Sequence, residues 1–251
     1  MLEIYDKMIG EIPVLEIVQS DLRDKKLPLV VFYHGWTNVK ERVLTNGYEI
    51  ARRGIRVIIP EALYHGKRTD GLTLEAHTLD FWQIVKNSVE EFPQIINYYS
   101  ELELVDQDNI GVSGLSMGGI TTAAILAAYP DVKAGNILMG APDFKEFGDY
   151  LATAGEQAGY QMRGEIEAEL ATIDAYDLGS HPEKIAGRPV HFWHGRQDGT
   201  VPFTNSFNFY EKYKEQAFGS HLSYTATEDD HRVPHDICLE SADFFAKNLG
   251  N

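Results

Sequence analysis

One short stretch decides the fold of this chain: Asn109-Ile110-Gly111-Val112-Ser113-Gly114-Leu115-Ser116-Met117-Gly118-Gly119. It begins with β-prone residues, continues as a Gly-x-Ser-x-Gly turn around Ser116, and leads into an alanine- and isoleucine-rich run typical of a helix over 116–129. A strand, a tight glycine turn and a helix together predict a nucleophile elbow, which exposes the serine hydroxyl at the end of a sheet. The helix N-terminus also places positive dipole where an oxyanion would form. The pattern is short enough to arise by chance as a glycine-rich turn with an incidental serine, so the rest of the chain must decide.

Outward from this stretch, apolar runs alternate with amphipathic ones. Buried strands are expected at 29–33, 56–60, 110–113, 133–139, 189–193 and 222–227. Helices are expected at 40–53, 78–101, 116–129, 204–216 and 234–248. Residues 2–9 and 14–20 predict an antiparallel hairpin at a sheet edge. Because strands and helices alternate, the sequence predicts an α/β fold with a mostly parallel sheet, helices on both faces, and a single domain over residues 1–251.

Residues 142–187 break this alternation. They carry helical stretches near 143–153 and 163–175 and a turn near His181-Pro182, without a strand pattern. The segment holds ten acidic residues against three basic ones. It is too long for an ordinary connection between two strands, so it predicts a helical cap insertion over the carboxyl edge of the sheet. The alternative is a solvated pair of helices packed on the flank.

Composition narrows the classes of protein that the chain could represent. The net charge of −16 argues against nucleic acid and anionic membrane surfaces as partners. No apolar run is long enough to span a bilayer and no leader pattern opens the chain, so we expect a cytoplasmic protein. The lone Cys238 fits a reducing compartment. Neither a histidine spacing for metal nor a phosphate loop is present, so no cofactor and no metal are expected, and the oligomeric state stays open.

A serine nucleophile requires an earlier loop that donates oxyanion N–H groups. The run Tyr33-His34-Gly35-Trp36 follows the first buried strand and predicts this loop. The backbone N–H groups of Trp36 and Met117 are the expected donors. Trp36 and His65 are expected to line the substrate pocket, whereas His34 is expected to be structural.

The acid and the base must follow the serine, in that order along the chain. Asp198 lies in a glycine-rich turn after the strand at 189–193 and is the predicted acid; Asp143, after the preceding strand, is the alternative. The predicted base is His231, in the loop before the last helix. His235 is the alternative, but it would lie within the start of that helix, where its ring is less free to reach Ser116.

Five motifs together resemble the α/β-hydrolase superfamily, and more narrowly the small bacterial carboxylesterases related to dienelactone hydrolases and to the catalytic domain of prolyl oligopeptidases. These motifs are Phe32-Tyr33-His34-Gly35-Trp36-Thr37, Tyr64-His65-Gly66-Lys67-Arg68, Gly114-Leu115-Ser116-Met117-Gly118-Gly119, His194-Gly195-Arg196-Gln197-Asp198-Gly199-Thr200-Val201-Pro202 and Asp230-His231-Arg232. The resemblance implies a serine carboxylesterase for small, short-acyl carboxylic esters, with Ser116, Asp198 and His231 as the triad.

The sequence departs from each of these relatives in one respect. The nucleophile is serine where dienelactone hydrolases use cysteine, and the β-propeller of prolyl oligopeptidases is lacking, which argues against peptide hydrolysis. His34-Gly35-Trp36 stands where hormone-sensitive-lipase-like esterases carry His-Gly-Gly. Two alternatives remain open: a peptidase, amidase or thioesterase that uses the same triad, and a binding module that keeps the hydrolase fold without catalysis.

Overall fold

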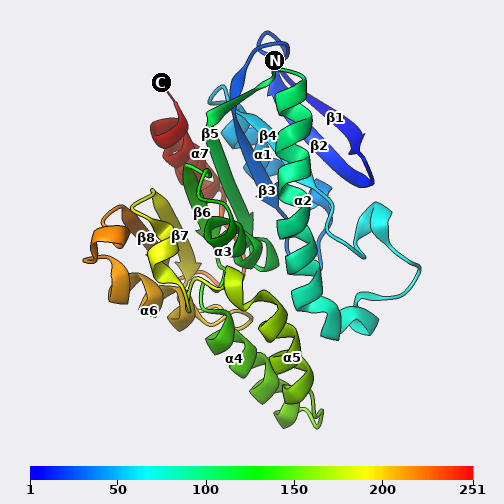
Figure 1. Ribbon diagram of the computed structural model, residues 1–251, viewed down its shortest axis with the longest axis vertical. Coiled ribbons are helices and arrows are strands. Elements are labelled where there is room, and N and C mark those ends of the chain that lie inside the picture. Colours follow the sequence, from blue (N-terminus) through cyan, green and yellow to red (C-terminus); the bar gives the residue numbers. More distant parts are fainter. Residues whose placement is uncertain (251) are drawn as a thin grey trace.

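An eight-stranded sheet forms the centre of the computed structural model, which describes residues 1–250 (Figure 1). Its strands are β1 (Leu2–Ile9), β2 (Ile12–Gln19), β3 (Leu27–Tyr33), β4 (Arg56–Pro60), β5 (Val105–Leu115), β6 (Ala134–Leu138), β7 (Val190–Gly195) and β8 (Leu222–Thr227). Their spatial order is β1-β2-β4-β3-β5-β6-β7-β8. The β1–β2 and β2–β4 pairs are antiparallel and all others are parallel, which confirms the predicted mostly parallel sheet with its N-terminal hairpin.

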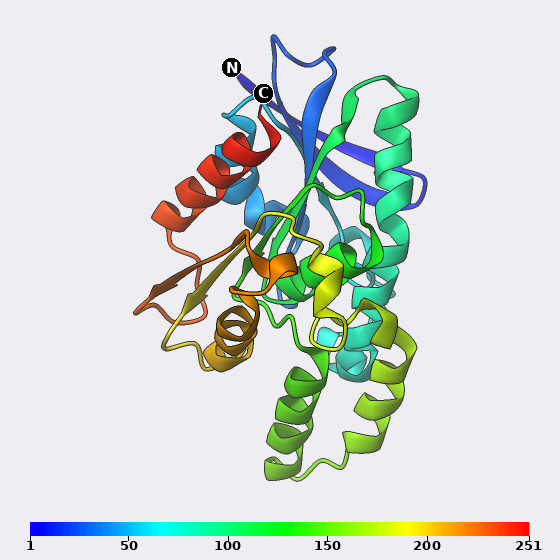
Figure 2. The same ribbon diagram turned by 60° about the vertical axis from the view of Figure 1, so that its left-hand side comes forward.

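Helices cover both faces of this sheet, as predicted (Figure 2). They are α1 (Leu44–Ala51), α2 (Phe81–Glu101), α3 (Met117–Ala128), α4 (Phe144–Gln157), α5 (Arg163–Ile173), α6 (Phe203–Tyr213) and α7 (His235–Leu249). The pair α1 and α7 packs on one face, over a core that includes Val30 and Trp193. The other face carries α2 and α3, over a core that includes Val31 and Ile120. No helix in residues 1–250 combines the length and the hydrophobicity needed to cross a bilayer.

Tertiary contacts move several of the predicted boundaries. The helix expected over 40–53 begins as a 3-10 turn at Lys40–Val43, where the Lys40 backbone N–H is bound by the Glu61 carboxylate. The helix expected from 78 starts at Phe81, after a 3-10 segment over Leu74–Asp80. The second hairpin strand starts at Ile12, because Gly10 takes a φ of 58° and lets two residues close the turn.

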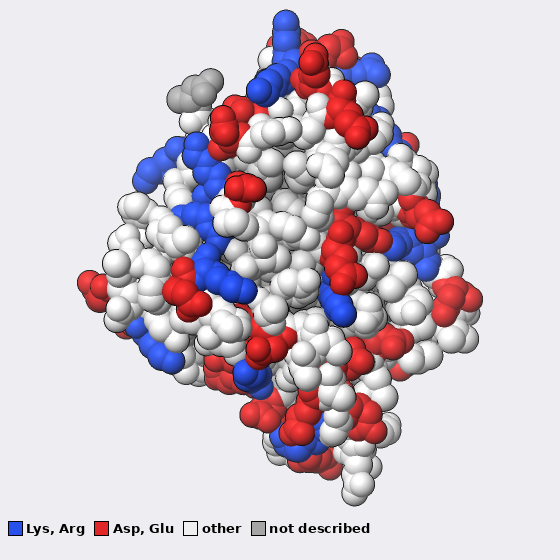
Figure 3. All heavy atoms as spheres, viewed as in Figure 1, with Lys and Arg blue, Asp and Glu red and all other residues white. Residues whose placement is uncertain are grey.

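The segment 142–187 contributes a pair of helices, α4 and α5, that projects beyond the end of the sheet (Figure 1, bottom). Arg163 joins the two helices, since its guanidinium lies 2.8 Å from the Asp149 carboxylate and 2.9 Å from that of Glu156. Acidic side chains outnumber basic ones in this segment, and red side chains are interspersed with blue ones at the bottom of Figure 3. We call α4 and α5 with their connection the helix pair below.

Candidate active site

Ser116 occupies a strained turn at the join of β5 and α3. Its φ of 57° and ψ of −120° are rare for a residue with a side chain and are characteristic of functional turns. The turn closes only because its glycines leave no side chain in the way. A β-carbon on Gly114 would lie 2.4 Å from the Gly118 carbonyl oxygen, and one on Gly118 would lie 2.1 Å from that of Tyr33. The glycine spacing seen in the sequence is therefore required by contacts between backbones.

The three side chains predicted from the sequence to form a triad lie close together in the structure. His231 Nε2 lies 2.9 Å from Ser116 Oγ, and His231 Nδ1 lies 2.7 Å from Asp198 Oδ2. A carboxylate oxygen can only accept, so the proton of the neutral imidazole is on Nδ1. The Nε2 lone pair therefore faces the serine hydroxyl, which is the orientation that a general base needs.

The Asp198 carboxylate is buried and accepts four hydrogen bonds. Its Oδ1 accepts from the backbone N–H groups of Thr200 and Val201, at 2.8 and 3.0 Å, and its Oδ2 accepts from His231 and from His194 Nε2, which lies 3.1 Å away. Burial alone would raise the pKa of Asp198, but the donations from His194, His231 and the Thr200 N–H outweigh it and hold this pKa well below its usual range. The carboxylate thus stays ionised wherever an imidazole titrates.

No role at the site was predicted for His194 from the sequence. The ring is fully buried at the end of β7, where Nδ1 accepts from Ser206 Oγ at 2.8 Å and Nε2 donates to Asp198. A strand-end histidine four residues before the acid was the available signal, but such a pattern does not distinguish a histidine that contacts the acid from an ordinary buried one.

The expected oxyanion donors, the backbone N–H groups of Trp36 and Met117, belong to segments next to Ser116. Met117 is the first residue of α3, so its N–H has no acceptor within the helix. The Gly35 backbone lies against the elbow, since a β-carbon built on it would be 3.4 Å from Ser116 Cβ. Within residues 1–250, the N–H groups of Trp36 and Met117 donate no hydrogen bond. Both remain available to an oxyanion at Ser116.

A cavity of about 310 Å³ opens at Ser116, between the sheet and the helix pair. Its lining residues are uncharged and mostly apolar: Trp36, Thr78, Leu79, Phe81, Trp82, Ser116, Met117, Ile120, Phe147, Leu151, Gly155, Met162, Ile166, Thr200 and Val201. The lining includes Trp36, as expected, but not His65, whose buried ring lies behind Trp36 and contacts its carbonyl oxygen. A larger open groove of about 850 Å³ lies at the opposite end of the sheet and contains none of the triad.

The alternative acid and base lie elsewhere. Asp143 caps α4, where its carboxylate accepts the Glu146 N–H at 2.9 Å. His235 begins α7 with a largely exposed ring, 3.4 Å from the Glu49 carboxylate. Neither residue contacts Ser116 or His231. Among the residues described, no group of three or more His, Cys, Asp or Glu side chains is placed to hold a metal ion.

Residues 51–251 match the model of the prolyl oligopeptidase family, which covers most of the chain and the whole Ser116, Asp198 and His231 cluster. The chain belongs to this family. This finding confirms the resemblance drawn from the sequence, and it makes the protein a serine hydrolase.

Two relatives are similar to this chain over their whole length, and a solved structure shares its fold. "Putative esterase YitV" of Bacillus subtilis (strain 168) is 35% identical and is aligned over 99% of this chain and 100% of its own length. "Esterase YjfP" of Escherichia coli (strain K12) is 28% identical over 99% of this chain and 100% of its own length. The crystal structure of TT1662 from Thermus thermophilus superposes with a TM-score of 0.74 at 17% identity, over 100% of this chain and 99% of that one, and so shares the fold.

The serine–histidine contact predicts covalent labelling by a fluorophosphonate probe. We expect one label per chain, on Ser116, because a hydroxyl that is hydrogen-bonded to a general base attacks phosphorus readily. Replacing His231 with Gln should slow labelling by about 10³-fold or more. The matched change His235→Gln should leave the labelling rate unchanged. Mass spectrometry of the labelled peptide measures both, and equal labelling of the Ser116→Ala protein would contradict the assignment.

Proposed function

We propose that this serine hydrolase is a carboxylesterase for small, uncharged esters, acting through the Ser116–His231–Asp198 triad. The observation that carries the proposal is the 2.9 Å contact between His231 Nε2 and Ser116 Oγ at the edge of an apolar cavity. The two relatives named as esterases, each aligned over its whole length, support the same reaction class.

The arrangement supports acyl transfer in two steps. His231 Nε2 takes the proton as Ser116 Oγ attacks the ester carbonyl carbon, and the N–H groups of Trp36 and Met117 hold the resulting oxyanion. His231 then gives this proton to the leaving alcohol as the carbonyl re-forms, which leaves an acyl group on Ser116. A water molecule then attacks that acyl group as His231 takes its proton, and His231 returns this proton to Ser116 Oγ as the acid is released.

The cavity favours a particular kind of acyl group. Its volume of about 310 Å³ lies at the small end of the range for ligand sites, and none of its lining residues is charged. Burying a charged group there would carry a large desolvation cost. We therefore expect neutral, short acyl chains, and we propose that the helix pair acts as a cap that covers this site.

Turnover of matched substrates tests the reaction class. Wild-type protein should hydrolyse p-nitrophenyl acetate, and Ser116→Ala should lose about 10³-fold or more of kcat. p-Nitroacetanilide should be cleaved far more slowly, since an amine is a poorer leaving group than an alkoxide or phenoxide. An acetyl thioester serves as the third substrate. Faster cleavage of the anilide or thioester would favour an amidase or thioesterase, and labelling without turnover of any substrate would favour a binding module.

Gly155 offers a test of the cavity as the acyl pocket. Gly155 and Met162 both line the cavity, and a β-carbon at position 155 would lie 2.5 Å from Met162 Sδ. Gly155→Leu would therefore displace the Met162 side chain and narrow the cavity. We expect kcat/KM for p-nitrophenyl octanoate to fall by about 10-fold or more relative to that for the acetate.

The matched control for this change is Gly164→Leu, on α5, where a β-carbon has no neighbour within 4 Å. It should leave the ratio of octanoate to acetate hydrolysis unchanged. An unchanged ratio in the Gly155→Leu protein would place the acyl group outside this cavity.

A further inference from the structure

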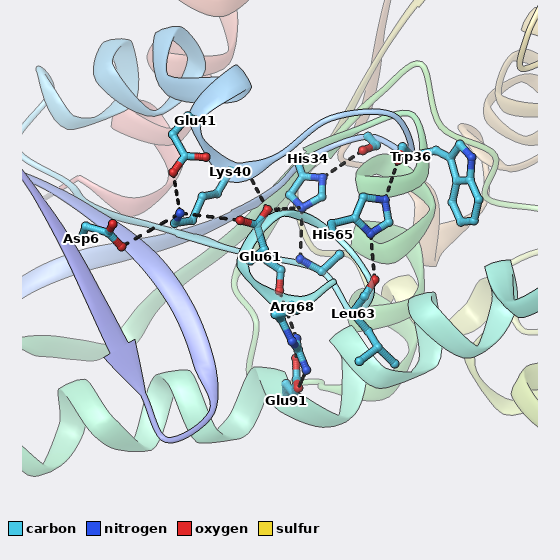
Figure 4. Close-up of polar contacts among 12 residues, drawn as sticks. Asp6, His34, Trp36, Lys40, Glu41, Glu61, Leu63, His65, Arg68 and Glu91 are labelled. Carbon is cyan, nitrogen blue, oxygen red and sulfur yellow. Dashed lines mark hydrogen bonds and ion pairs between the residues drawn. The ribbon is translucent and has the colours of Figure 1, made fainter. Parts of the chain in front are cut away.

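His34 lies at the end of β3 with its ring 1% exposed, directly before the glycine of the oxyanion loop (Figure 4). It does not line the cavity, so it cannot touch a substrate. Its Nδ1 lies 2.9 Å from the Gly35 carbonyl oxygen. Because a carbonyl oxygen only accepts, Nδ1 must carry a proton whatever the charge of the ring.

The Gly35 carbonyl and the Trp36 N–H are the two ends of one peptide group. This group is planar, so a bond that fixes the carbonyl also fixes the direction of the N–H. A hydrogen bond donated to the oxygen also polarises the peptide group, which makes its N–H a stronger hydrogen-bond donor. The same oxygen accepts the Asn38 N–H at 3.0 Å. His34 therefore fixes the direction of the Trp36 N–H, the group that we assign to the oxyanion, through the carbonyl at the other end of the same peptide group.

The far side of the His34 ring is anchored to the end of β4. Its Nε2 accepts the Ala62 N–H at 3.1 Å and lies 3.3 Å from Glu61 Oε1. The same Glu61 oxygen accepts the Lys40 N–H at 3.0 Å, and the Lys40 ammonium lies 3.6 Å from Oε2. The Glu61 and Lys40 side chains are each only 1% exposed. The Glu61 carboxylate thus lies beside the His34 ring and binds the chain that follows the oxyanion loop.

A second histidine restrains the next peptide along. His65 Nε2 contacts the Trp36 carbonyl oxygen, and its Nδ1 lies 2.8 Å from that of Leu63. Burial lowers the pKa of His65. Both carbonyl oxygens can only accept, and we assign the ring proton to Nε2, where it binds the Trp36 carbonyl. The two rings also pack together, with centroids 5.1 Å apart. Each carbonyl that flanks the Trp36 N–H is therefore held by one histidine (Figure 4).

We propose that His34 and His65 are positioning residues for the oxyanion hole: His34 through Nδ1 and the Gly35 carbonyl, His65 through Nε2 and the Trp36 carbonyl. This inference rests on the proposed esterase function. It assigns both histidines to the stabilisation of the transition state, although neither reaches the substrate. It also assigns a role to the Tyr64-His65-Gly66 motif, which contributes no residue to the triad or to the cavity lining.

The two positions call for opposite substitutions. An asparagine places its amide N–H near the position of Nδ1, and a glutamine near that of Nε2. At position 34, Asn should therefore preserve the useful donor and Gln should lose it, whereas at position 65 Gln should preserve it and Asn should lose it. A general loss of packing would not produce this crossed order.

The experiment measures kcat, KM and the inhibition constant of phenylboronic acid for the four variants H34N, H34Q, H65Q and H65N. The tetrahedral serine adduct of this inhibitor places a boron-bound oxygen in the oxyanion hole. We expect H34Q and H65N to lose about 10- to 100-fold in kcat, with phenylboronic acid weakened by a similar factor and KM within about three-fold of wild type. H34N and H65Q should retain most of the wild-type kcat.

Two outcomes would overturn the inference. One is wild-type kcat in H34Q and H65N; the other is the same order of Asn and Gln at both positions, with losses that follow the melting temperature. If the variants at one position do not fold, the order of the Asn and Gln variants in kcat at the other position still tests the inference. A wild-type protein without esterase turnover would instead refute the proposed function, so the two failures are distinguishable.

Discussion

The active site depends on how closely the first turn of α3 approaches the end of β3. No side chain fits between them, since a β-carbon on Gly118 would lie 2.1 Å from the Tyr33 carbonyl oxygen, far inside van der Waals contact. This contact holds Ser116 in a conformation that few residues adopt. It also sets the loop that follows Tyr33 beside the serine, so that nucleophile and oxyanion donors come from two segments fixed against each other.

Around that contact, three buried histidines hold the loops that carry the reactive groups. His194 donates to Asp198, while His34 and His65 contact the carbonyls on either side of the Trp36 N–H. Each has a second contact: Ser206 for His194, the Ala62 N–H for His34, and the Leu63 carbonyl for His65. Rigid placement of this kind favours catalysis, because donors that are already oriented need not reorganise during the reaction.

Local pattern was enough to predict the parallel sheet and the spatial convergence of Ser116, Asp198 and His231, because parallel strands deliver their following loops to one edge. It was not enough for His65, which the motif suggested as a pocket residue. The side-chain direction of His65 depends on where the Trp36 carbonyl lies, and these two residues come together only in the folded chain. The helix start at Phe81 and the cavity lined by Gly155 likewise depend on packing between segments distant in sequence.

The central claim is that Ser116 forms an acyl-enzyme with an ester. Rapid acid quenching of the protein mixed with p-nitrophenyl acetate, followed by peptide mass spectrometry, tests it most directly. The account predicts one acetyl group on the peptide that contains Ser116, formed in a burst with p-nitrophenolate and removed at the steady-state rate. Turnover of the ester without any acetylated Ser116 peptide, or with the acetyl group on another residue, would contradict it.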